Sequence, residues 1–181
     1  MRVPKILYHG TTVLRWNFIK REGLLRCNMS KSFEAEETLG FSSGYVYLTT
    51  SLDEAIMYGL NKSLQDMAYL HIDQKSNKLD PNYRDSVVLS INGSKLGDNL
   101  EIDPQVNTSL VQQIRDVTSA QWYRYRGDIK LKHLHARKYV PFDTFSSNLI
   151  NKMTEINEKK FNVGQLVMKQ LTNKTKCGLL S

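Results

Sequence analysis

The sequence predicts a mixed fold of the α+β class, with short strands and amphipathic helices following one another along 181 residues. Short segments with period-two alternation predict the strands, and capped segments with helical spacing predict the helices. Hydrophobic residues make up 40% and charged residues 24% of the chain. These fractions are close to those of an ordinary globular domain and exclude a wholly disordered chain. Because no run of about 18 apolar residues occurs, we expect no membrane span.

The first predicted elements are a strand over residues 5–9, ended by Gly10, and a helix capped by Thr11 or Thr12. The apolar face of this helix is expected to consist of Leu14, Phe18 and Ile19. Gly23 suits the left-handed conformation that commonly follows a helix, so we expect the helix to end there.

A second strand is predicted over residues 44–49, with Val46 and Leu48 on one face and the tyrosines on the other. Residues 51–54 form a capping box, which predicts a helix beginning at Leu52. The buried stripe of this helix is expected to consist of Leu52, Ala55, Ile56 and Leu60. Tyr58 lies off the centre of that stripe, so we expect its ring to be available to a ligand.

The remaining segments complete the predicted domain. Further strands are expected over residues 87–91, 121–125 and 138–141. Helices are expected over 108–116 and around Leu149–Ile156 and Val163–Leu171, and residues 26–43 are expected to form a long loop. We therefore predict a domain over residues 1–143 and a basic helical extension over residues 144–181. The extension contains six lysines and only two glutamates.

The chain carries a net charge of +7, which suits a partner rich in phosphate, although a solvated lysine face would look the same. The candidate contacts to nucleic acid are Arg124, Arg126, Lys130, Lys132, Arg137 and Lys138. The only two cysteines, Cys27 and Cys177, have no metal-binding or redox spacing. Together with an N-terminus that lacks the pattern of a secretory signal, they favour a cytoplasmic protein that needs no metal.

Two groups of residues could carry chemistry. His9, Gly10 and Thr11 stand at the end of the first strand, where a histidine can hydrogen-bond a sugar hydroxyl and a glycine admits a close ligand. Tyr47 and Tyr58 could form a slot for a flat cationic ring. Each group also has a purely structural interpretation, as a strand-end histidine and as tyrosines covering a half-exposed sheet.

The order and spacing of these motifs resemble the ADP-ribosyltransferase superfamily, in its His-Tyr-Glu branch that includes diphtheria toxin and the poly(ADP-ribose) polymerases. The resemblance rests on residues 7–12, the helix ending at Gly23, and residues 44–51 with Ala55 and Tyr58. It implies a split β-sheet core with flanking helices, followed here by the C-terminal helical extension. It also implies that NAD is the substrate and that no metal takes part.

The resemblance assigns a role to each motif residue. His9 would hold the adenosine-side ribose of NAD, Gly10 and Thr11 would complete this first motif, and Gly10 would contact the nicotinamide carboxamide. Tyr47 and Tyr58 would flank the nicotinamide ring. Ala55 stands where polymerase-type members have a serine that bonds the carboxamide, so that contact would be missing here.

The third motif departs from the family. Active members have a glutamate near the start of a late strand, but residues 118–125 contain no acid. Gln121 is the expected equivalent, because its amide oxygen can accept a ribose hydroxyl, although it stabilises a developing cation less well than a carboxylate.

The resemblance therefore implies a mono-ADP-ribosyltransferase with a protein or nucleic-acid acceptor. Two alternatives stay open. One is an RNA 2′-phosphotransferase-like enzyme, whose second motif the chain does not match. The other is an inactive member of the fold that binds NAD or ADP-ribose without turnover.

Overall fold

The computed structural model describes residues 3–27, 44–69, 80–103, 120–155 and 157–158. They fall into two compact units that meet in the sequence between Thr144 and Phe145. The first unit contains the sheet, and in the second residues 147–155 are helical. The predicted helices over 108–116 and 163–171, and the predicted loop except at its first residues, lie outside the described residues.

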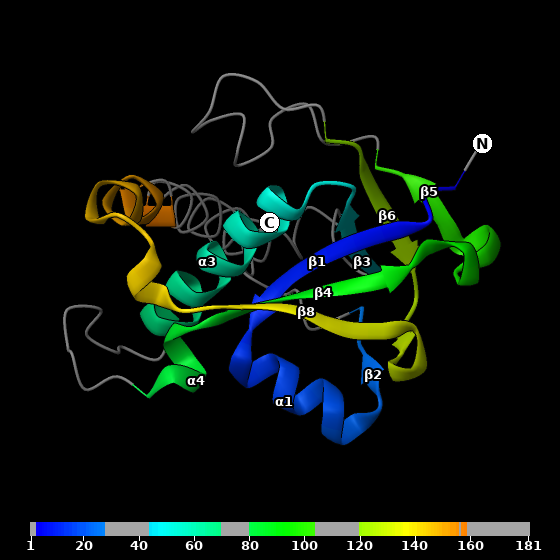
Figure 1. Ribbon diagram of the computed structural model, residues 1–181, viewed down its shortest axis with the longest axis horizontal. Coiled ribbons are helices and arrows are strands. Elements are labelled where there is room, and N and C mark those ends of the chain that lie inside the picture. The colour runs from blue at the N-terminus through cyan, green and yellow to red at the C-terminus, as the bar shows by residue number, and fades with distance from the viewer. Residues whose placement is uncertain (1–2, 28–43, 70–79, 104–119, 156, 159–181) are drawn as a thin grey trace, which may run out of the picture. The chain divides into compact units, whose positions relative to one another are not determined.

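The first unit is a mixed α+β fold built on one six-stranded antiparallel sheet in the order β5-β6-β3-β1-β4-β8 (Figure 1). Its strands are β1 (Ile6–Thr12), β3 (Tyr45–Thr49), β4 (Ser86–Asn92), β5 (Leu100–Ile102), β6 (Trp122–Arg126) and β8 (Leu134–Val140). Two short strands, β2 (Leu24–Leu25) and β7 (Ile129–Lys130), pair in a separate ladder.

The six strands are not paired evenly. β1 pairs with β4 over its full length, from Ile6↔Asn92 to Thr12↔Ser86. Between β1 and β3 the register contains a single pair, Tyr8↔Thr49. The sheet is therefore divided into a β1-β4-β8 half and a β3-β6-β5 half that part beyond Tyr8.

One face of the sheet carries the core. Cross-strand neighbours share a face, and the pairs Leu7↔Ile91 and Leu48↔Tyr123 are almost fully buried. The opposite face carries Tyr8, Gly10, Tyr47, Thr49 and Trp122, as their register positions require.

Helix α1 (Val13–Glu22) contributes Trp16 and Ile19 to the core face. Its expected ends are confirmed, because the Thr12 hydroxyl accepts the Arg15 N–H at 3.3 Å and Gly23 has a left-handed φ of 73°. Leu14 and Phe18 were expected to be buried but are only half-buried. Trp16 takes the place next to the sheet instead.

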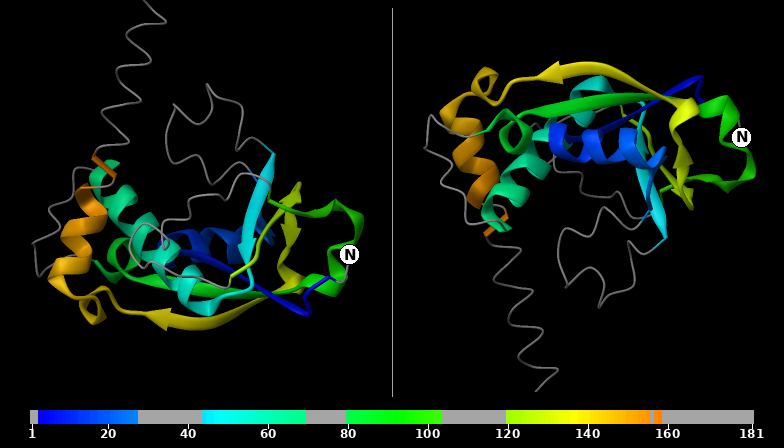
Figure 2. Two further views of the ribbon diagram at one scale, coloured as in Figure 1. Left: turned by 90° about the horizontal axis from the view of Figure 1, so that it is seen from above. Right: turned by 90° about the horizontal axis from the view of Figure 1, so that it is seen from below.

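Helix α3 (Leu52–Tyr69) covers the opposite face, so α3 lies in front when the strands are seen from above and α1 when they are seen from below (Figure 2). Its buried side includes Ala55 and Leu60 as expected, whereas Leu52 and Ile56 are half-buried. A short helix, α4 (Pro81–Arg84), precedes β4.

Several predicted boundaries are wrong. Gly10 does not end the first strand, because pairing with β4 continues through Thr12. β8 begins at Leu134 rather than Lys138, and β2, β5 and β7 are not predicted at all. These strands are short or polar, and their pairing partners are distant in the sequence, so no local alternation marks them.

Candidate active site

The candidate site lies where β1 and β3 part. At this point the imidazole of His9 lies against β3, and its Nδ1 is 2.9 Å from the carbonyl oxygen of Tyr47. A carbonyl can only accept, so Nδ1 carries the proton and donates it. The side chain thus replaces the ladder bond that the diverging strands no longer make, and it joins the first predicted motif to the second.

The surroundings of His9 keep its ring neutral. Burial lowers the pKa of His9 below its usual 6.5, the hydrogen bond to Tyr47 partly opposes this, and the nearby charges of Arg15 and Lys62 lower it further. With Nδ1 protonated and the ring neutral, Nε2 has a lone pair. None of the described residues forms a hydrogen bond with Nε2, so it can accept one from a ligand hydroxyl.

Two cations therefore stand close to His9, and one of them is held firmly. Arg15, in the first turn of α1, donates from Nε and Nη2 to the two carboxylate oxygens of Asp66 on α3, each at 2.8 Å. The two side chains are 21% and 14% exposed. This bidentate pair ties α1 to α3 and fixes the guanidinium near the site.

The two tyrosines of the predicted slot come from β3 and α3. Tyr47 belongs to the sheet face that α3 covers, and Tyr58 lies on α3 itself. The ring of Tyr58 contacts the indole of Trp122 on β6, with centroids 5.0 Å apart and planes tilted by 59°. Nε1 of this indole is buried and has no acceptor among the described residues.

In the structure Gly10 packs against α3, and Thr11 lies on the core side of the sheet. A Cβ on Gly10 would lie 1.8 Å from the carbonyl oxygen of Ala55 and 2.6 Å from the backbone nitrogen of Gly59. The absence of a side chain at Gly10 thus admits the backbone of α3. Thr11 is only 3% exposed and pairs with Val87 on the core side.

Gln121 stands at the start of β6 and is fixed by its backbone and side chain. It exchanges two hydrogen bonds with Thr50, and its Oε1 accepts the hydroxyl of Tyr123 at 2.9 Å. Strand alternation places Gln121 with Tyr123, on the side opposite Trp122 and Tyr47. The amide oxygen still has a second lone pair. The same alternation places Gln121 on the side of the sheet that carries His9, whereas Trp122 faces α3.

The predicted basic contacts do not form one continuous patch. Arg124 on β6 is paired with Glu101 at 2.6 Å and stacks on Tyr45, whereas Arg126 is exposed at the end of the same strand. The other members lie on β7, on the 3₁₀ turn η3 (Leu131–His133) and on β8: Lys130, Lys132, Arg137 and Lys138. Three strands separate β6 from β8 in the sheet.

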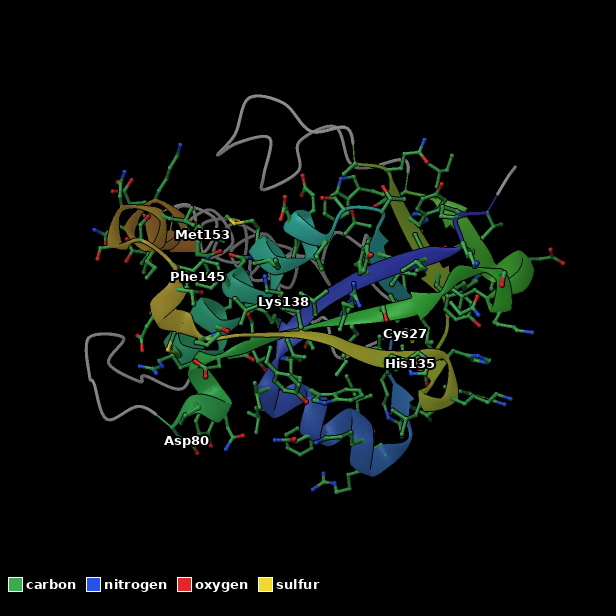
Figure 3. The ribbon with its side chains drawn as sticks, viewed as in Figure 1. Cys27, Asp80, His135, Lys138, Phe145 and Met153 are labelled. Carbon is green, nitrogen blue, oxygen red and sulfur yellow. The ribbon has the colours of Figure 1, made fainter. Side chains whose placement is uncertain are left out.

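The second group has the stronger concentration of charge. The pKa of His133 is lowered by burial and then by Lys132, Lys130 and Lys95, so these three ammonium groups lie close enough to act on it. Five consecutive residues of β8, from His135 to Tyr139, are exposed at the edge of the sheet. Figure 3 shows the side chains of His135 and Lys138 along this strand.

The sequence did not predict Arg15 and Lys62 near His9, nor Trp122 on the sheet face that α3 covers. Arg15 and Lys62 lie on helices that follow the expected motifs. The sequence alone does not show which face of a helix a charged residue occupies, so their place near His9 could not be predicted. Trp122 directly follows Gln121, and an indole has none of the acceptor chemistry of the missing glutamate. The register of β6 against β3 would have been needed to select it.

Comparisons with protein-family models, with curated proteins and with solved structures found no match for this chain. The described residues contain no group of three or more His, Cys, Asp or Glu side chains able to hold a metal ion. Among the helices of the described part, none has both the length and the apolar character needed to cross a membrane.

Proposed function

We propose that the protein is an NAD-dependent mono-ADP-ribosyltransferase of the His-Tyr-Glu branch, acting on a protein or nucleic-acid acceptor. The observation that carries the proposal is the hydrogen bond from His9 Nδ1 to the Tyr47 carbonyl across the parted strands. It brings together two motifs separated by 38 positions in the sequence. A sheet that divides between β1 and β3 also supports the split core that the resemblance implies.

The residues around His9 suit the parts of NAD. Nε2 of the neutral imidazole would accept a hydroxyl of the adenosine-side ribose. Arg15 and Lys62 supply positive charge near this position, which favours the diphosphate. Tyr47 and Tyr58 would flank the nicotinamide, whose positive charge is attracted to aromatic faces.

The reaction needs no redox partner. The bond between the ribose C1 and the nicotinamide nitrogen breaks, and its electron pair leaves with neutral nicotinamide. The ribose passes through an oxocarbenium-like state, as in glycoside hydrolysis. A nucleophile of the acceptor then bonds to C1 and loses its proton to solvent. Orientation of NAD and electrostatic stabilisation supply the rate enhancement.

The direct test is nicotinamide release by the purified protein, with and without cell lysate as a source of acceptors. We expect release by the wild type, transfer of label from ADP-ribose-labelled NAD to a macromolecule, and loss of both in His9→Ala. The matched control is His135→Ala, which removes an exposed imidazole on β8 and should have no effect. Equal rates for His9→Ala and wild type would contradict the proposal.

A second candidate, binding of NAD or ADP-ribose without turnover, is favoured by the third motif. The β6 residue that faces α3 is Trp122, and the amide of Gln121 is already bonded to Tyr123. Neither side chain carries negative charge. Calorimetry that detects NAD binding, combined with no nicotinamide release over hours, would select this candidate over the transferase.

A further inference from the structure

Positive side chains gather at one edge of the sheet, along β8 and the segment directly before it. Residues 129–139 contain four lysines or arginines and no acid. A further cation, Lys95, lies close enough to His133 to lower its pKa together with Lys130 and Lys132. All of these cations are exposed. We call them the basic edge, which consists of Lys95, Lys130, Lys132, Arg137 and Lys138.

The positive charges of the basic edge are not balanced by acids of the described residues. Elsewhere several arginines are paired with carboxylates: Arg15 with Asp66, Arg84 with Asp143 and Arg124 with Glu101. No cation of the basic edge forms an ion pair with a described residue. Like charges that lie close together repel one another, and bound anions relieve this repulsion. The basic edge therefore suits a partner that carries several negative groups.

An added β-strand is a poor occupant of this edge. In the described sheet β8 pairs only with β4, so one side of its backbone faces outward. The register of the two strands shifts between Val88 and Leu89, which leaves Arg137 as an additional residue without a cross-strand partner. A bulge of this kind bends the strand, and charged side chains on an edge discourage pairing with another chain. We therefore expect a partner to be held by the side-chain cations rather than by backbone pairing.

The cations are spread along a line. Lys95, Lys130 and Lys132 lie near His133, directly before β8, whereas Arg137 and Lys138 lie in the second half of the strand (Figure 3). β8 has seven residues and therefore extends for about 20 Å. A single phosphate could occupy only one end of this line. The phosphates of a nucleic-acid backbone can contact cations along its whole length.

One exposed aromatic ring accompanies these cations. Tyr139 directly follows Lys138 on β8 and is 57% exposed. Its hydroxyl accepts the indole N–H of Trp16 at 3.0 Å, so the phenol is held at one end while much of its surface remains accessible. An unpaired base can stack on such a ring, whereas the bases of a duplex already stack on one another. Tyr139 therefore favours a single strand over a duplex.

We propose that the basic edge and Tyr139 bind a single-stranded nucleic acid, whose phosphates contact the cations along β8 and one of whose bases stacks on Tyr139. The groups that are recognised, phosphates and an unpaired base, are common to RNA and DNA. The inference goes beyond the proposed transferase, because it does not depend on the binding or cleavage of NAD.

The test is fluorescence anisotropy of labelled single-stranded RNA and DNA with the full chain, without NAD. Arg137→Gln/Lys138→Gln should weaken binding about 25-fold in about 0.1 M salt, because each phosphate contact of a single strand contributes a factor of about five at that concentration. The matched control is Arg21→Gln/Arg126→Gln, which removes two exposed charges from α1 and β6 and should bind as wild type does. The same weakening in both double variants would overturn the inference, because net charge would then account for the binding.

Tyr139→Leu separates stacking from charge, because it removes the ring and leaves every cation in place. Binding of the single strand should weaken at least about five-fold, and binding of a duplex of the same length should not change. Tighter binding of the duplex than of the single strand would overturn the inference. Displacement of the oligonucleotide by polyglutamate at the same concentration of charge would also overturn it and would indicate an acidic peptide instead.

Wild type supplies the first outcome of the experiment. Binding of either the RNA or the DNA strand supports the inference. Failure to bind both strands would overturn it without bearing on the transferase, which is tested separately by nicotinamide release.

Discussion

His9 illustrates how a single backbone contact fixes the chemistry of a side chain. The Tyr47 carbonyl holds the proton on Nδ1, and burial together with Arg15 and Lys62 keeps the ring neutral. An imidazole in this state is a hydrogen-bond acceptor at Nε2, whereas a protonated imidazole is a donor at both nitrogens. A ribose hydroxyl can therefore donate a hydrogen bond to Nε2 only while the imidazole is neutral.

NAD affinity should therefore depend on pH in a specific direction. Because the pKa of His9 lies below 6.5, the ring is neutral at pH 7 and above. We expect a constant dissociation constant for NAD from pH 8 to 7, and weaker binding only as the pH falls below 6.5 and the lowered pKa is approached. Titration calorimetry across this pH range measures the dissociation constant. Affinity that rises on acidification would contradict the neutral acceptor.

The sequence allows some of this site to be predicted, and the reasons are local. His9 follows an apolar strand and Tyr47 lies within a clean alternation, so both can be placed on strands that end near each other. Glu54 belongs to a recognisable capping box, which predicts the start of a helix. The same pattern gives no reason to expect that the Glu54 side chain is buried. Trp122 and Arg15 become site residues only through the register of β6 and the packing of α1, neither of which has a local signal.

At the scale of elements, the close crossing of α3 over β1 positions the site. The carbonyl of Ala55 and the nitrogen of Gly59 approach β1 at Gly10, directly after His9. A helix can come this near a strand only where the strand residue has no Cβ. The crossing places Tyr58 against Trp122 of β6 and Lys62 close enough to His9 to lower its pKa.

Replacing Gly10 should therefore disrupt the fold rather than ligand contact alone. In Gly10→Ala the new methyl would meet the Ala55 carbonyl, and we expect a loss of about 3 kcal/mol or more in the free energy of unfolding. The comparison is Gly44→Ala, where φ is +87° and the described atoms leave open space. That change should cost only about 1–2 kcal/mol, from backbone strain. Chemical denaturation measures both, and equal losses would show that the crossing tolerates a side chain.

The elements themselves are predicted with uneven success, for physical reasons. The ends of α1, the faces of β3 and the buried strand β4 follow from caps and alternation, which are properties of adjacent residues. β5 has three residues, of which two are exposed, and β2 and β7 have two residues each. Such strands exist only because a distant partner is present, so their positions depend on the assembled sheet.

In the described part of the molecule, positive side chains gather at two places. Arg15 and Lys62 lie near His9, while Lys95, Lys130 and Lys132 lie near His133, which directly precedes the edge strand β8. Positive side chains on an edge strand discourage pairing with other chains. They also attract phosphates. Because His133 has a lowered pKa, it adds no charge at pH 7, and the lysines dominate this surface.

If this surface binds a nucleic-acid acceptor, its lysines should determine the salt dependence of binding. For single strands the logarithm of the association constant falls with the logarithm of salt concentration with a slope of about −0.7 per phosphate contact. Lys130→Gln/Lys132→Gln should therefore reduce the magnitude of the slope by about 1.4. Fluorescence anisotropy with a labelled single-stranded oligonucleotide measures it without NAD. Lys20→Gln/Arg21→Gln removes the same charge from α1 and should leave the slope unchanged. An equal reduction in both variants would indicate attraction by net charge alone, whereas a reduction confined to the first pair would locate the phosphates beside β8.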